Sequence, residues 1–432
     1  MMTQTPLLVI LAGGASSRMW PLREKSLIRF GDEPLLVTQL KRYVALGLRE
    51  VVIVASPDNR ADIEGLARGV AQLNVQIVVQ EEPKGMGDAV LKVEPALANR
   101  ADGAIYITQV HDVVDDRLHL DMLSAHRNYP QATYLAGYEM EEYFPGGYLI
   151  VDEHGRISGV VEKPGADKRP SKLVTFVAHV HSSARALFEA IKAEYAKDVP
   201  TDDHYERAMD ALMKQQVYQV VRYNGHWSAL KFPWHVLDVM NYFLDQLKGK
   251  GQQVAADAYI AKTATLVGDV YIGAGAKVFP GAAVVGPAYV GAGVIVGNNA
   301  LVRNSMVLDG CEVGFTTEIA RSYVGDHCGM HACRVLDSVF APRVNFSAGC
   351  TTANLRIDHG EVSSVVKGKK MGSGRNKLGA IIGQGAFIAV DAMTMPGVKI
   401  GEGTQIGPGT HVIHDVLDGK RVYVKQELVI SD

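Results

Sequence analysis

Apolar and polar positions follow two different patterns along the chain, and the first pattern covers residues 1 to about 250. The sequence predicts buried strands at five apolar runs, Leu7–Leu11, Val51–Ala55, Val75–Val79, Ala104–Ile107 and Tyr134–Gly137. It predicts helices at Leu35–Leu46, Asn59–Leu73 and Val236–Leu247. Strands that alternate with helices favour an α/β domain with a mostly parallel sheet, which binds ligands at the carboxyl ends of its strands.

The second pattern is a period of six that begins at Val254. Branched aliphatic residues stand six apart at Val254, Ile260, Leu266, Ile272, Val278, Val284, Val290, Val296, Val302 and Leu308. The period blurs after Leu308 and resumes at Ile382, Ile388, Thr394, Ile400, Ile406 and Val412. A six-residue repeat predicts a parallel β-helix with three short strands per coil and the aliphatic side chains stacked inside. We therefore expect two domains, residues 1–250 and 251–432, with the boundary near Gly251.

Composition narrows the class of protein. The chain has 432 residues with 44 Lys and Arg against 47 Asp and Glu, a net charge of −3 that is unlike a nucleic-acid-binding polycation or an acidic disordered tail. No apolar run approaches the ~20 residues that span a bilayer, and the start of the chain lacks the layout of a signal peptide. We expect a cytoplasmic protein without nucleic-acid or membrane partners.

The four cysteines lie within forty residues, at Cys311, Cys328, Cys333 and Cys350, and never as C-x-x-C. This spacing supports neither a disulfide framework nor a zinc site, so we expect buried, apolar cysteines.

The first predicted strand leads into a run rich in glycine and basic residues. The run is Leu11-Ala12-Gly13-Gly14-Ala15-Ser16-Ser17-Arg18-Met19, followed by Pro21-Leu22 and Lys25. A glycine pair after a strand leaves backbone N–H groups open to a phosphate, and Arg18 and Lys25 can neutralise a triphosphate. The alternative is a tight turn that carries two solvated basic residues.

This run resembles the L-A-G-G-x-x-[ST]-R-[LM]…K signature of sugar-1-phosphate nucleotidylyltransferases, which have a Rossmann-like fold. The resemblance implies that a nucleoside triphosphate and a sugar-1-phosphate, with Mg²⁺, give a nucleoside diphosphate sugar and pyrophosphate. Uridine is the base that the family favours. Arg18 and Lys25 would be catalytic, and Leu11, Ala12, Gly13 and Gly14 would bind the nucleotide.

Further segments resemble other parts of the family's site, in chain order. Gln80 and the stretch Gly85-Met86-Gly87-Asp88-Ala89 resemble the segment that reads the nucleobase, so Gln80, Gly85 and Met86 would also bind the nucleotide. Asp112 stands where the family has the aspartate that holds Mg²⁺. Gly147, Glu162 and Lys163 match the residues that contact the sugar phosphate, and Trp227 with Pro233-Trp234 resembles the last motif.

Three positions depart from the family. His111 replaces the glycine before the metal aspartate, and Phe176 lies where a sugar-contacting N-x-G is expected. Ala229 occupies the position of the second metal-binding aspartate, with Lys231 nearby. Another acidic residue could supply the ligand, or Lys231 could contribute positive charge directly to the phosphates. The remaining alternative is a catalytically inactive domain that binds a nucleotide sugar as a regulator.

The six-residue period resembles the left-handed β-helix of hexapeptide-repeat acyltransferases, in which three copies usually associate. Between its two regular runs lie His331, Asn345, Ala353-Asn354-Leu355-Arg356 and the cationic loop, which we define as residues 366–383. This succession resembles the acetyltransferase half of the bifunctional N-acetylglucosamine-1-phosphate uridylyltransferase/glucosamine-1-phosphate acetyltransferase family, in its archaeal form. With the first domain in front, the resemblance covers essentially the whole chain.

The resemblance implies a second site that uses acetyl-CoA. His331 matches the base that deprotonates the amine of glucosamine-1-phosphate, and Asn345, Asn354, Arg356 and Lys377 match the rest of the acyl-transfer site. Arg356, Lys369, Lys370, Arg375 and Lys377 would form a cationic group for phosphates, unless they are only a solvated surface.

Two family residues for the sugar phosphate are missing from this second site. Arg334 stands in place of the tyrosine and Ala320 in place of the lysine. The acceptor could therefore differ from glucosamine-1-phosphate, or acetyl transfer could be lost.

The leading interpretation is a nucleoside diphosphate sugar pyrophosphorylase with an acyltransferase site on its β-helix. The alternatives are a non-catalytic nucleotide-sugar sensor, a β-helix acyltransferase whose first domain only recognises substrate, and a β-helix that merely trimerises the chain. We expect a homotrimer, although a hexamer or a hetero-assembly is equally compatible with the sequence.

Overall fold

The computed structural model describes residues 5–14, 16–97, 102–197 and 202–431. It contains two compact units, and these do not follow chain order. The first unit comprises the described residues of Met1–Ala15 and Pro34–Ala229, and the second those of Ser16–Glu33 and Leu230–Asp432. The boundary expected near residue 250 separates the two sequence patterns, whereas the second unit also takes in residues 16–33 and 230–250.

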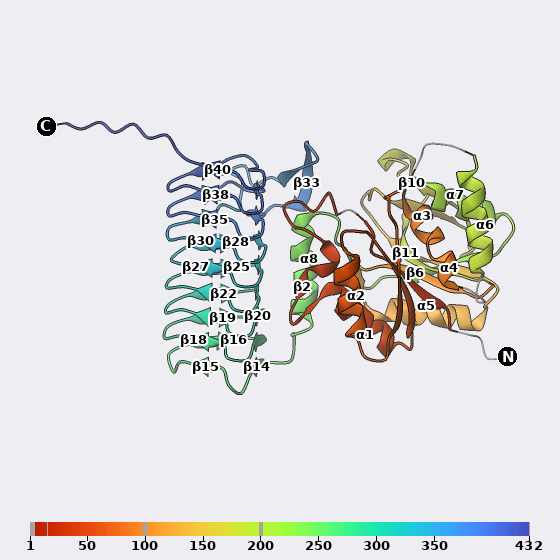
Figure 1. Cartoon of the computed structure of the whole chain (residues 1–432), viewed down its shortest axis with the longest axis horizontal. Helices are drawn as coiled ribbons and strands as arrows, with labels where there is room; N and C mark the ends of the chain where they lie inside the picture. The colour runs from red at the N-terminus through yellow and green to blue at the C-terminus, as the bar shows by residue number, and fades with distance from the viewer. Residues whose placement is uncertain (1–4, 15, 98–101, 198–201, 432) are drawn as a thin grey trace. The chain divides into compact units, whose positions relative to one another are not determined.

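The first unit is built on a nine-stranded sheet with flanking helices (Figure 1). The strands of the unit are β1 (Leu7–Leu11), β4 (Glu50–Ala55), β5 (Asn74–Val79), β6 (Ile105–Gln109), β7 (Asp112–Val114), β8 (Thr133–Glu139), β9 (Gly147–Val151), β10 (Ile157–Glu162), β11 (Leu173–His181), β12 (Tyr218–Tyr223) and β13 (Trp227–Ala229). The helices are α1 (Leu35–Ala45), α2 (Arg60–Arg68), α3 (Met86–Leu91), α4 (Glu94–Leu97), α5 (Asp116–Asn128), α6 (Ala184–Tyr195) and α7 (His204–Met213), with a 3₁₀ turn η3 (Ala166–Lys168).

The five predicted strands are all present in this sheet. Strands β6, β1, β4 and β5 are parallel neighbours, as expected for a Rossmann-like domain. Beyond β6 the sheet is mixed rather than mostly parallel, because β11 runs antiparallel to β6, β8 and β9. Helix α2 is shorter than predicted because it ends at Arg68, where Gly69 forms the C-cap.

The second unit contains the β-helix, whose strands form three parallel sides (Figure 1). The first side consists of β14 (Gln252–Val254), β17 (Val270–Ile272), β20 (Ala288–Val290), β23 (Met306–Val307), β26 (Tyr323–Val324), β29 (Val339–Phe340), β34 (Ile381–Ile382) and β37 (Lys399–Ile400). The second consists of β15 (Tyr259–Ile260), β18 (Lys277–Val278), β21 (Ile295–Val296), β24 (Glu312–Val313), β27 (Gly329–Met330), β30 (Asn345–Phe346), β35 (Phe387–Ile388), β38 (Gln405–Ile406) and β40 (Arg421–Val422). The third consists of β16 (Thr265–Val267), β19 (Ala283–Val285), β22 (Leu301–Arg303), β25 (Glu318–Ala320), β28 (Arg334–Leu336), β31 (Thr351–Thr352), β36 (Met393–Thr394) and β39 (His411–Val412).

The aliphatic residues of the six-residue period form the core of this β-helix, as predicted. Ile272, Val284, Val296 and Ile388 are fully buried, whereas Val254 at the open end of the first coil is exposed. The four cysteines are also buried and free, which confirms their interpretation as apolar core residues.

The period blurs after Leu308 because the coils become shorter, although the β-helix continues. Tyr271 pairs with Tyr289, 18 residues on, but Tyr289 pairs with Met306 after 17 and Tyr323 with Val339 after 16. Each lost residue shifts the sequence spacing without disturbing the stack. Val339 then pairs with Ile381, because the chain leaves the stack between them to form the hairpin of β32 (Val362–Val366) and β33 (Lys369–Arg375) (Figure 1).

The rest of the second unit consists of short elements. They are η1 (Lys25–Leu27), β2 (Arg29–Phe30), η4 (Pro233–His235) and α8 (Val236–Asp245), while β3 (Glu33–Pro34) crosses from this unit into the first. Within the described residues, no helix is both long enough and apolar enough to cross a bilayer.

Candidate functional site

The first glycine of the pair after β1 lies where an added side chain would crowd the neighbouring strand end. The N–H of Ala12 donates to the carbonyl of Val54 at 2.8 Å, which continues the sheet by one residue. A Cβ on Gly13 would stand 3.1 Å from the carbonyl oxygen of Ala55 and 3.5 Å from Gln80 Oε1. Gly14 is exposed, with nothing within 4 Å of an added Cβ. The backbone at this strand end is therefore open to a ligand. Ala15 lies outside the described residues.

Gln80 links this strand end to the turn that carries Gly85 and Met86. Its buried amide Nε2 donates to the carbonyl of Gly85 at 3.0 Å and to Asp88 Oδ2 at 2.9 Å. Gly85 adopts a φ of 95° and precedes α3, where a residue with a Cβ would be strained. The structure thus brings together Gly13, Gln80, Gly85 and Met86, the first residue of α3, and it fixes the orientation of the Gln80 amide.

Asp112 and Ala229 face each other on paired strands. Strand β13 runs antiparallel to β7, and Ala229 is the register partner of Asp112. The indole N–H of Trp227 donates to Asp112 Oδ1 at 3.0 Å, and the carboxylate is buried. Ala229 therefore does lie where a second carboxylate would meet the first.

The residues around Asp112 fit a magnesium ion only in the binding mode in which the protein supplies few of its ligands. Among the described residues, no group of three or more His, Cys, Asp and Glu side chains is arranged to hold a metal. Mg²⁺ commonly takes one or two carboxylates and completes its shell with substrate phosphates and water. Asp112 supplies one carboxylate, which suffices for that mode.

Phe176 packs against Trp227, the residue that bonds to Asp112. The two rings stack with centroids 4.6 Å apart and planes 19° apart, and Phe144 and Tyr138 contact the same indole at 5.2 and 5.4 Å. Phe176 thus belongs to an aromatic cluster that fixes the Trp227 indole against Asp112. An aromatic ring cannot replace the hydrogen bonds that an asparagine makes to sugar hydroxyls.

Gly147, Glu162 and Lys163 meet at the ends of the β9–β10 hairpin. Gly147 is the register partner of Glu162, and a Cβ on Gly147 would stand 3.1 Å from Glu162 Oε2. Lys163 Nζ lies 3.0 Å from Glu162 Oε1, an ion pair that raises the pKa of the lysine. These three residues therefore form one local group.

Glu206 of α7 lies beside this group and was not predicted. Its burial raises the pKa of the carboxyl to about 7, with further upward contributions from Glu162 and Asp203 and a downward one from Lys163. A helix that buries Tyr205, Ala208 and Met209 on one face gives no sequence signal that its neighbouring glutamate is also partly enclosed.

Glu206 should make stability depend on pH. Because the folded pKa is raised, the folded chain binds the proton more tightly than the unfolded chain, and stability falls as pH rises from about 4.5 to about 7. We expect Glu206→Gln to raise the free energy of unfolding at pH 8 by up to roughly 3 kcal/mol, with little effect at pH 5. Denaturant titrations at both pH values measure this. Glu189→Gln, at an exposed position of α6, is the control, and equal effects at pH 5 and pH 8 would contradict the assignment.

The basic part of the signature, Arg18 and Lys25, lies in the second unit. Arg18 is exposed, and Lys25 begins the η1 turn. Glu24 fixes this turn, since its Oε1 accepts from the N–H of Ser26 at 3.1 Å and from Ser16 Oγ at 3.4 Å.

The predicted acyl-transfer residues fall on two edges of the β-helix. His331 follows β27 on the second side, is exposed, and donates its backbone N–H to the carbonyl of Phe346 at 3.3 Å. Asn345 lies on β30 of the same side, in the next coil, as the register partner of Gly329. Asn354 follows β31 on the third side. Within one chain, His331 and Asn345 are thus neighbours, and Asn354 belongs to a different edge.

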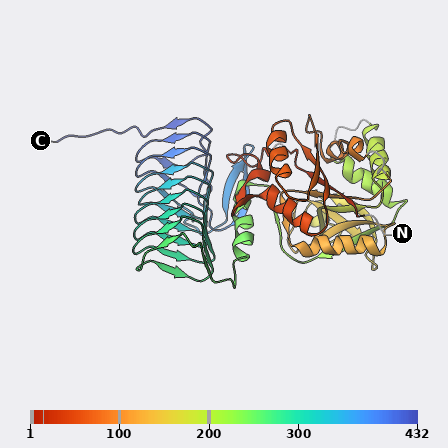
Figure 2. The ribbon, with the colours of Figure 1, turned by 60° about the horizontal axis from the view of Figure 1, so that its bottom comes forward.

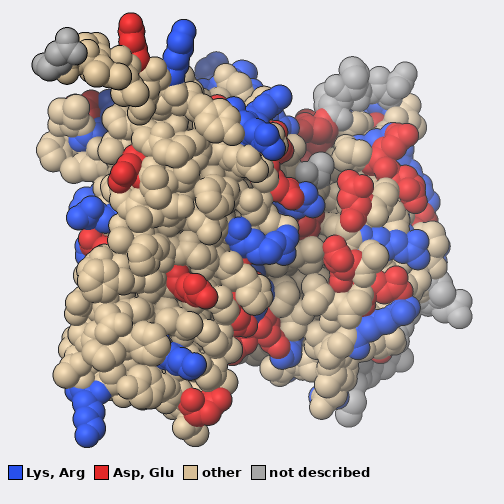
Figure 3. Space-filling view, turned by 60° about the vertical axis from the view of Figure 1, so that its left-hand side comes forward, with Lys and Arg blue, Asp and Glu red and all other residues tan. Residues whose placement is uncertain are grey.

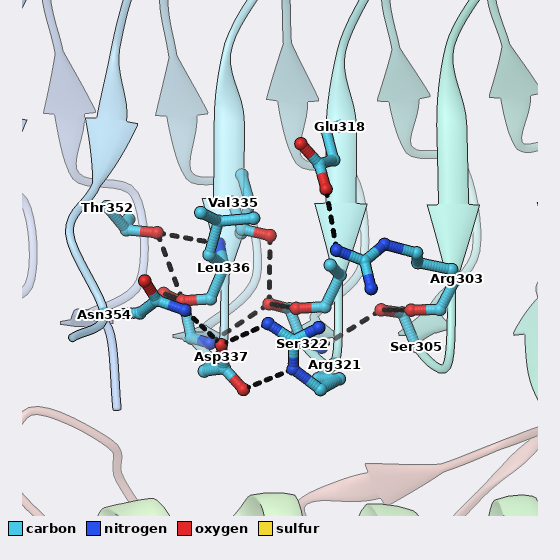
Figure 4. Close-up of polar contacts among 12 residues, drawn as sticks. Arg303, Ser305, Glu318, Arg321, Ser322, Val335, Leu336, Asp337, Thr352 and Asn354 are labelled. Atoms are coloured by element: carbon cyan, nitrogen blue, oxygen red, sulfur yellow. Dashed lines mark hydrogen bonds and ion pairs between the residues drawn. The ribbon is translucent and has the colours of Figure 1, made fainter. Parts of the chain in front are cut away.

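Asn354 is part of an ion-pair network at that edge (Figure 4). Arg321 binds Asp337 with two hydrogen bonds of 2.7 Å, and the Asn354 amide donates to the same carboxylate (Figure 4). Ala320, which stands at the family lysine position, is fully buried. Arg321, the next residue, is engaged with Asp337.

The cationic residues separate into two sets. Arg356 pairs with Asp358 beside it, and Arg375 pairs with Asp238 of α8. Lys377 pairs through its backbone with Leu355. In the part of the chain that the structure describes, Lys369, Lys370 and Lys377 form no side-chain ion pair. Of the five cationic residues predicted to bind phosphates, these three lysines remain as candidates for an unneutralised phosphate site.

Comparison with known proteins gives the family. The nucleotidyl transferase family model matches residues 7–228, more than half of the chain. The chain belongs to the nucleotidyl transferase family.

Relatives of this nucleotidyl transferase match it along most of its length. A bifunctional sugar-1-phosphate nucleotidylyltransferase/acetyltransferase of Sulfurisphaera tokodaii is 29% identical over 94% of this chain and 97% of its own. The bifunctional protein GlmU of Methanococcus vannielii is 29% identical over 98% of this chain and 99% of its own. The catalytic subunit beta of mannose-1-phosphate guanylyltransferase from Drosophila pseudoobscura pseudoobscura is 27% identical over 72% of this chain and 84% of its own.

Two further matches cover parts of the nucleotidyl transferase. Residues 266–371 match the family described as GMPPB C-terminal domain. A structure of UDP-glucose pyrophosphorylase with UDP-glucose is 17% identical, covers 56% of this chain and all of that one, and has a TM-score of 0.48. The family assignment confirms that the chain is an enzyme of the predicted class. The strand pairing confirms an α/β first domain that is followed in sequence by a β-helix.

Proposed function

We propose that this nucleotidyl transferase joins a nucleoside triphosphate to a sugar-1-phosphate and forms a nucleoside diphosphate sugar and pyrophosphate. The observation that carries the proposal is the cradle at the end of β1, where a Cβ on Gly13 would crowd the carbonyl of Ala55 and lie 3.5 Å from the oriented amide of Gln80. Uridine and a hexose or N-acetylhexosamine are the substrates that the family resemblance favours.

The chemistry needs no protein nucleophile, because the sugar phosphate is already anionic. A phosphate oxygen attacks the α-phosphorus in line, the bond to the β-phosphate oxygen breaks, and pyrophosphate leaves with the electron pair. Arg18 and Lys25 would neutralise the charge that develops on the leaving group. Lys163, held by Glu162, would orient the sugar phosphate. Mg²⁺ held by Asp112 would supply Lewis-acid charge neutralisation to the phosphates.

Pyrophosphate release tests this proposal directly. Each of the common nucleoside triphosphates is paired with glucose-1-phosphate, N-acetylglucosamine-1-phosphate or mannose-1-phosphate in the presence of Mg²⁺. Turnover with one pair identifies both substrates. If a folded chain released no pyrophosphate with any pair, the proposal would be refuted. That result would favour the nucleotide-sugar sensor that Ala229, Phe176 and Ala320 suggest.

Ala229→Asp should restore the second carboxylate opposite Asp112. Since the two residues are register partners on β13 and β7, the new side chain adds negative charge beside the first. We expect the Mg²⁺ concentration for half-maximal pyrophosphate release to fall about tenfold, as measured by Mg²⁺ titration at saturating substrates. Ala229→Asn is the uncharged control of similar size. An unchanged or higher Mg²⁺ requirement in Ala229→Asp would show that Ala229 does not mark the missing ligand.

We also propose an acetyl-CoA-dependent acyltransferase site on the β-helix, around His331 and Asn345. Support comes from their position on adjacent coils of one side, with His331 exposed to a substrate. An amino-sugar phosphate is the acceptor class that the family resemblance favours.

A homotrimer formed through the β-helix is part of this proposal. Figure 3 shows a face of the β-helix on which charged side chains are sparse. Exposed large apolar side chains on its second and third sides include Tyr259, Phe387 and Met393. Such surface is typical of an interface. Light scattering of the intact chain tests the trimer, and a monomer at micromolar concentration would contradict it.

A further inference from the structure

The residues that carry Arg18 and Lys25 are held by the β-helix. We call residues 16–33 the anchored segment, and they belong to the same compact unit as the β-helix. The segment contacts residues of the first side of the β-helix or of the corners beside it, at sequence separations of up to 398 residues. Its position therefore depends on the fold of the second half of the chain.

The first anchor is Arg29. Its guanidinium donates to Asp326 Oδ1 at 2.6 Å and to Asp309 Oδ2 at 2.8 Å, two carboxylates on successive corners. The Arg29 side chain is 23% exposed and the two carboxylates 32% and 19%, so solvent screens the pairs only in part. The hydroxyl of Tyr323 donates to the Arg29 carbonyl at 2.8 Å. This anchor thus fixes both the backbone and the side chain of Arg29.

The second anchor is Trp20. Its indole N–H donates to Asp418 Oδ1 at 3.0 Å, and the ammonium of Lys399 lies 4.8 Å from the ring centroid. Lys399 is nearly enclosed, with 4% of its side chain exposed, and also donates to the carbonyl of Val365 in the hairpin. Arg23 pairs with Glu402 close by. This anchor fixes the segment two residues after Arg18.

Lys25 lies between the two anchors, and Arg18 adjoins the second. A free segment of this length would sample many conformations, and each residue fixed before the reaction removes an entropic cost from it. The anchors themselves are made by side chains with no expected contact to substrate. Their effect on catalysis would be through the positions of Arg18 and Lys25.

We propose that the β-helix is a positioning element for nucleotidyl transfer, with Arg29 and Trp20 holding the cationic segment that neutralises the leaving group. This inference rests on the proposed nucleotidyl transfer. It assigns to Asp309, Asp326 and Asp418, which lie in the half of the chain that resembles an acetyltransferase, a role in the other reaction.

The test uses full-length variants on the β-helix side of the contact. We expect Asp309→Asn with Asp326→Asn to lower kcat for pyrophosphate release by about tenfold to a hundredfold, with a smaller change in KM. Trypsin should also cut faster after Arg23 and Lys25, because the released segment opens locally. Asp418→Ala tests the second anchor independently should the double variant fail to fold. Asp257→Asn, an exposed carboxylate elsewhere on the β-helix, is the matched control.

Two further comparisons separate positioning from general stability. Adding Arg29→Gln to the double variant should cause no further loss of kcat, since the same contact is already broken. Arg29→Lys should retain more activity than Arg29→Gln. Thermal unfolding checks that the variants fold as well as the control.

The outcomes are distinct. An intact chain that releases no pyrophosphate would refute the proposed function and this inference with it. If the intact chain is active but the folded anchor variants have the same kcat as Asp257→Asn, only this inference is refuted. This holds with or without faster tryptic cleavage.

Discussion

Replacement of Lys25 by alanine is expected to lower kcat for pyrophosphate release by about 10²–10³-fold, while KM for the nucleotide rises less than tenfold. The reason is that the pyrophosphate leaving group gains charge mainly in the transition state, so a cation placed there stabilises it more than the bound substrate. Steady-state kinetics with the best substrate pair measures both constants. Lys25→Arg should retain part of kcat because it keeps the charge with a different shape.

Lys248→Ala provides the matched control for this prediction. Lys248 is an exposed lysine that pairs with Asp245 at 2.7 Å, outside the signature. Its loss should leave both constants unchanged. If Lys25→Ala instead raised KM and left kcat intact, Lys25 would serve ground-state binding alone, and the leaving-group role would have to pass to Arg18 or Lys231.

The β-helix was predictable because its inward positions repeat locally. A buried side chain such as Val284 or Val296 occurs at the same place in every hexad, so spacing alone defines three sides and a core. The coils of 17 and 16 residues could not be predicted in this way. Removing one corner residue breaks the period that defines the pattern but leaves strands such as β26 and β29 stacked.

The sheet of the first unit was predictable where its strands are continuous apolar runs. Strands β1, β4 and β6 are of this kind and pair in parallel. Strand β11 carries Thr175, His179 and His181 among its apolar residues, so its sequence does not predict a buried strand. The two histidines are accommodated because both bond to the Tyr205 hydroxyl at 2.8 Å, a partner far away in sequence.

The candidate site also has a part that the sequence predicts and a part that it does not. Motif matching located Asp112, and the position of Ala229 opposite it follows from strand pairing. The roles of Trp227 as a donor to Asp112 and of Phe176 as the ring stacked on Trp227 are tertiary contacts. The anchors are still harder to predict from the sequence, since Arg29 bonds to carboxylates 280 and 297 residues away. A single sequence contains no signal that pairs such positions.

Replacement of His331 by alanine should abolish most free-thiol release from acetyl-CoA and leave pyrophosphate release unchanged. A positioned base contributes about 10²–10⁴-fold to the deprotonation of an amine, and His331 is exposed beside Asn345 on the second side of the β-helix. The assay uses the intact chain with acetyl-CoA and glucosamine-1-phosphate, and it follows the thiol with a chromogenic disulfide. Other amino-sugar phosphates are included because Ala320 and Arg334 replace the family residues for the phosphate.

His414→Ala is the matched control, since His414 is an exposed histidine near the end of the β-helix. Light scattering checks that both variants keep the oligomeric state of the parent chain. Thiol release that survives in His331→Ala would show that another group accepts the proton. Loss of both activities would instead indicate that the substitution disturbs the β-helix and, through it, the anchored segment. The variant keeps the backbone hydrogen bond from the N–H of His331 to the carbonyl of Phe346, so we expect the coil to stay intact. Loss of thiol release alone would therefore place the two reactions at separate sites of one chain.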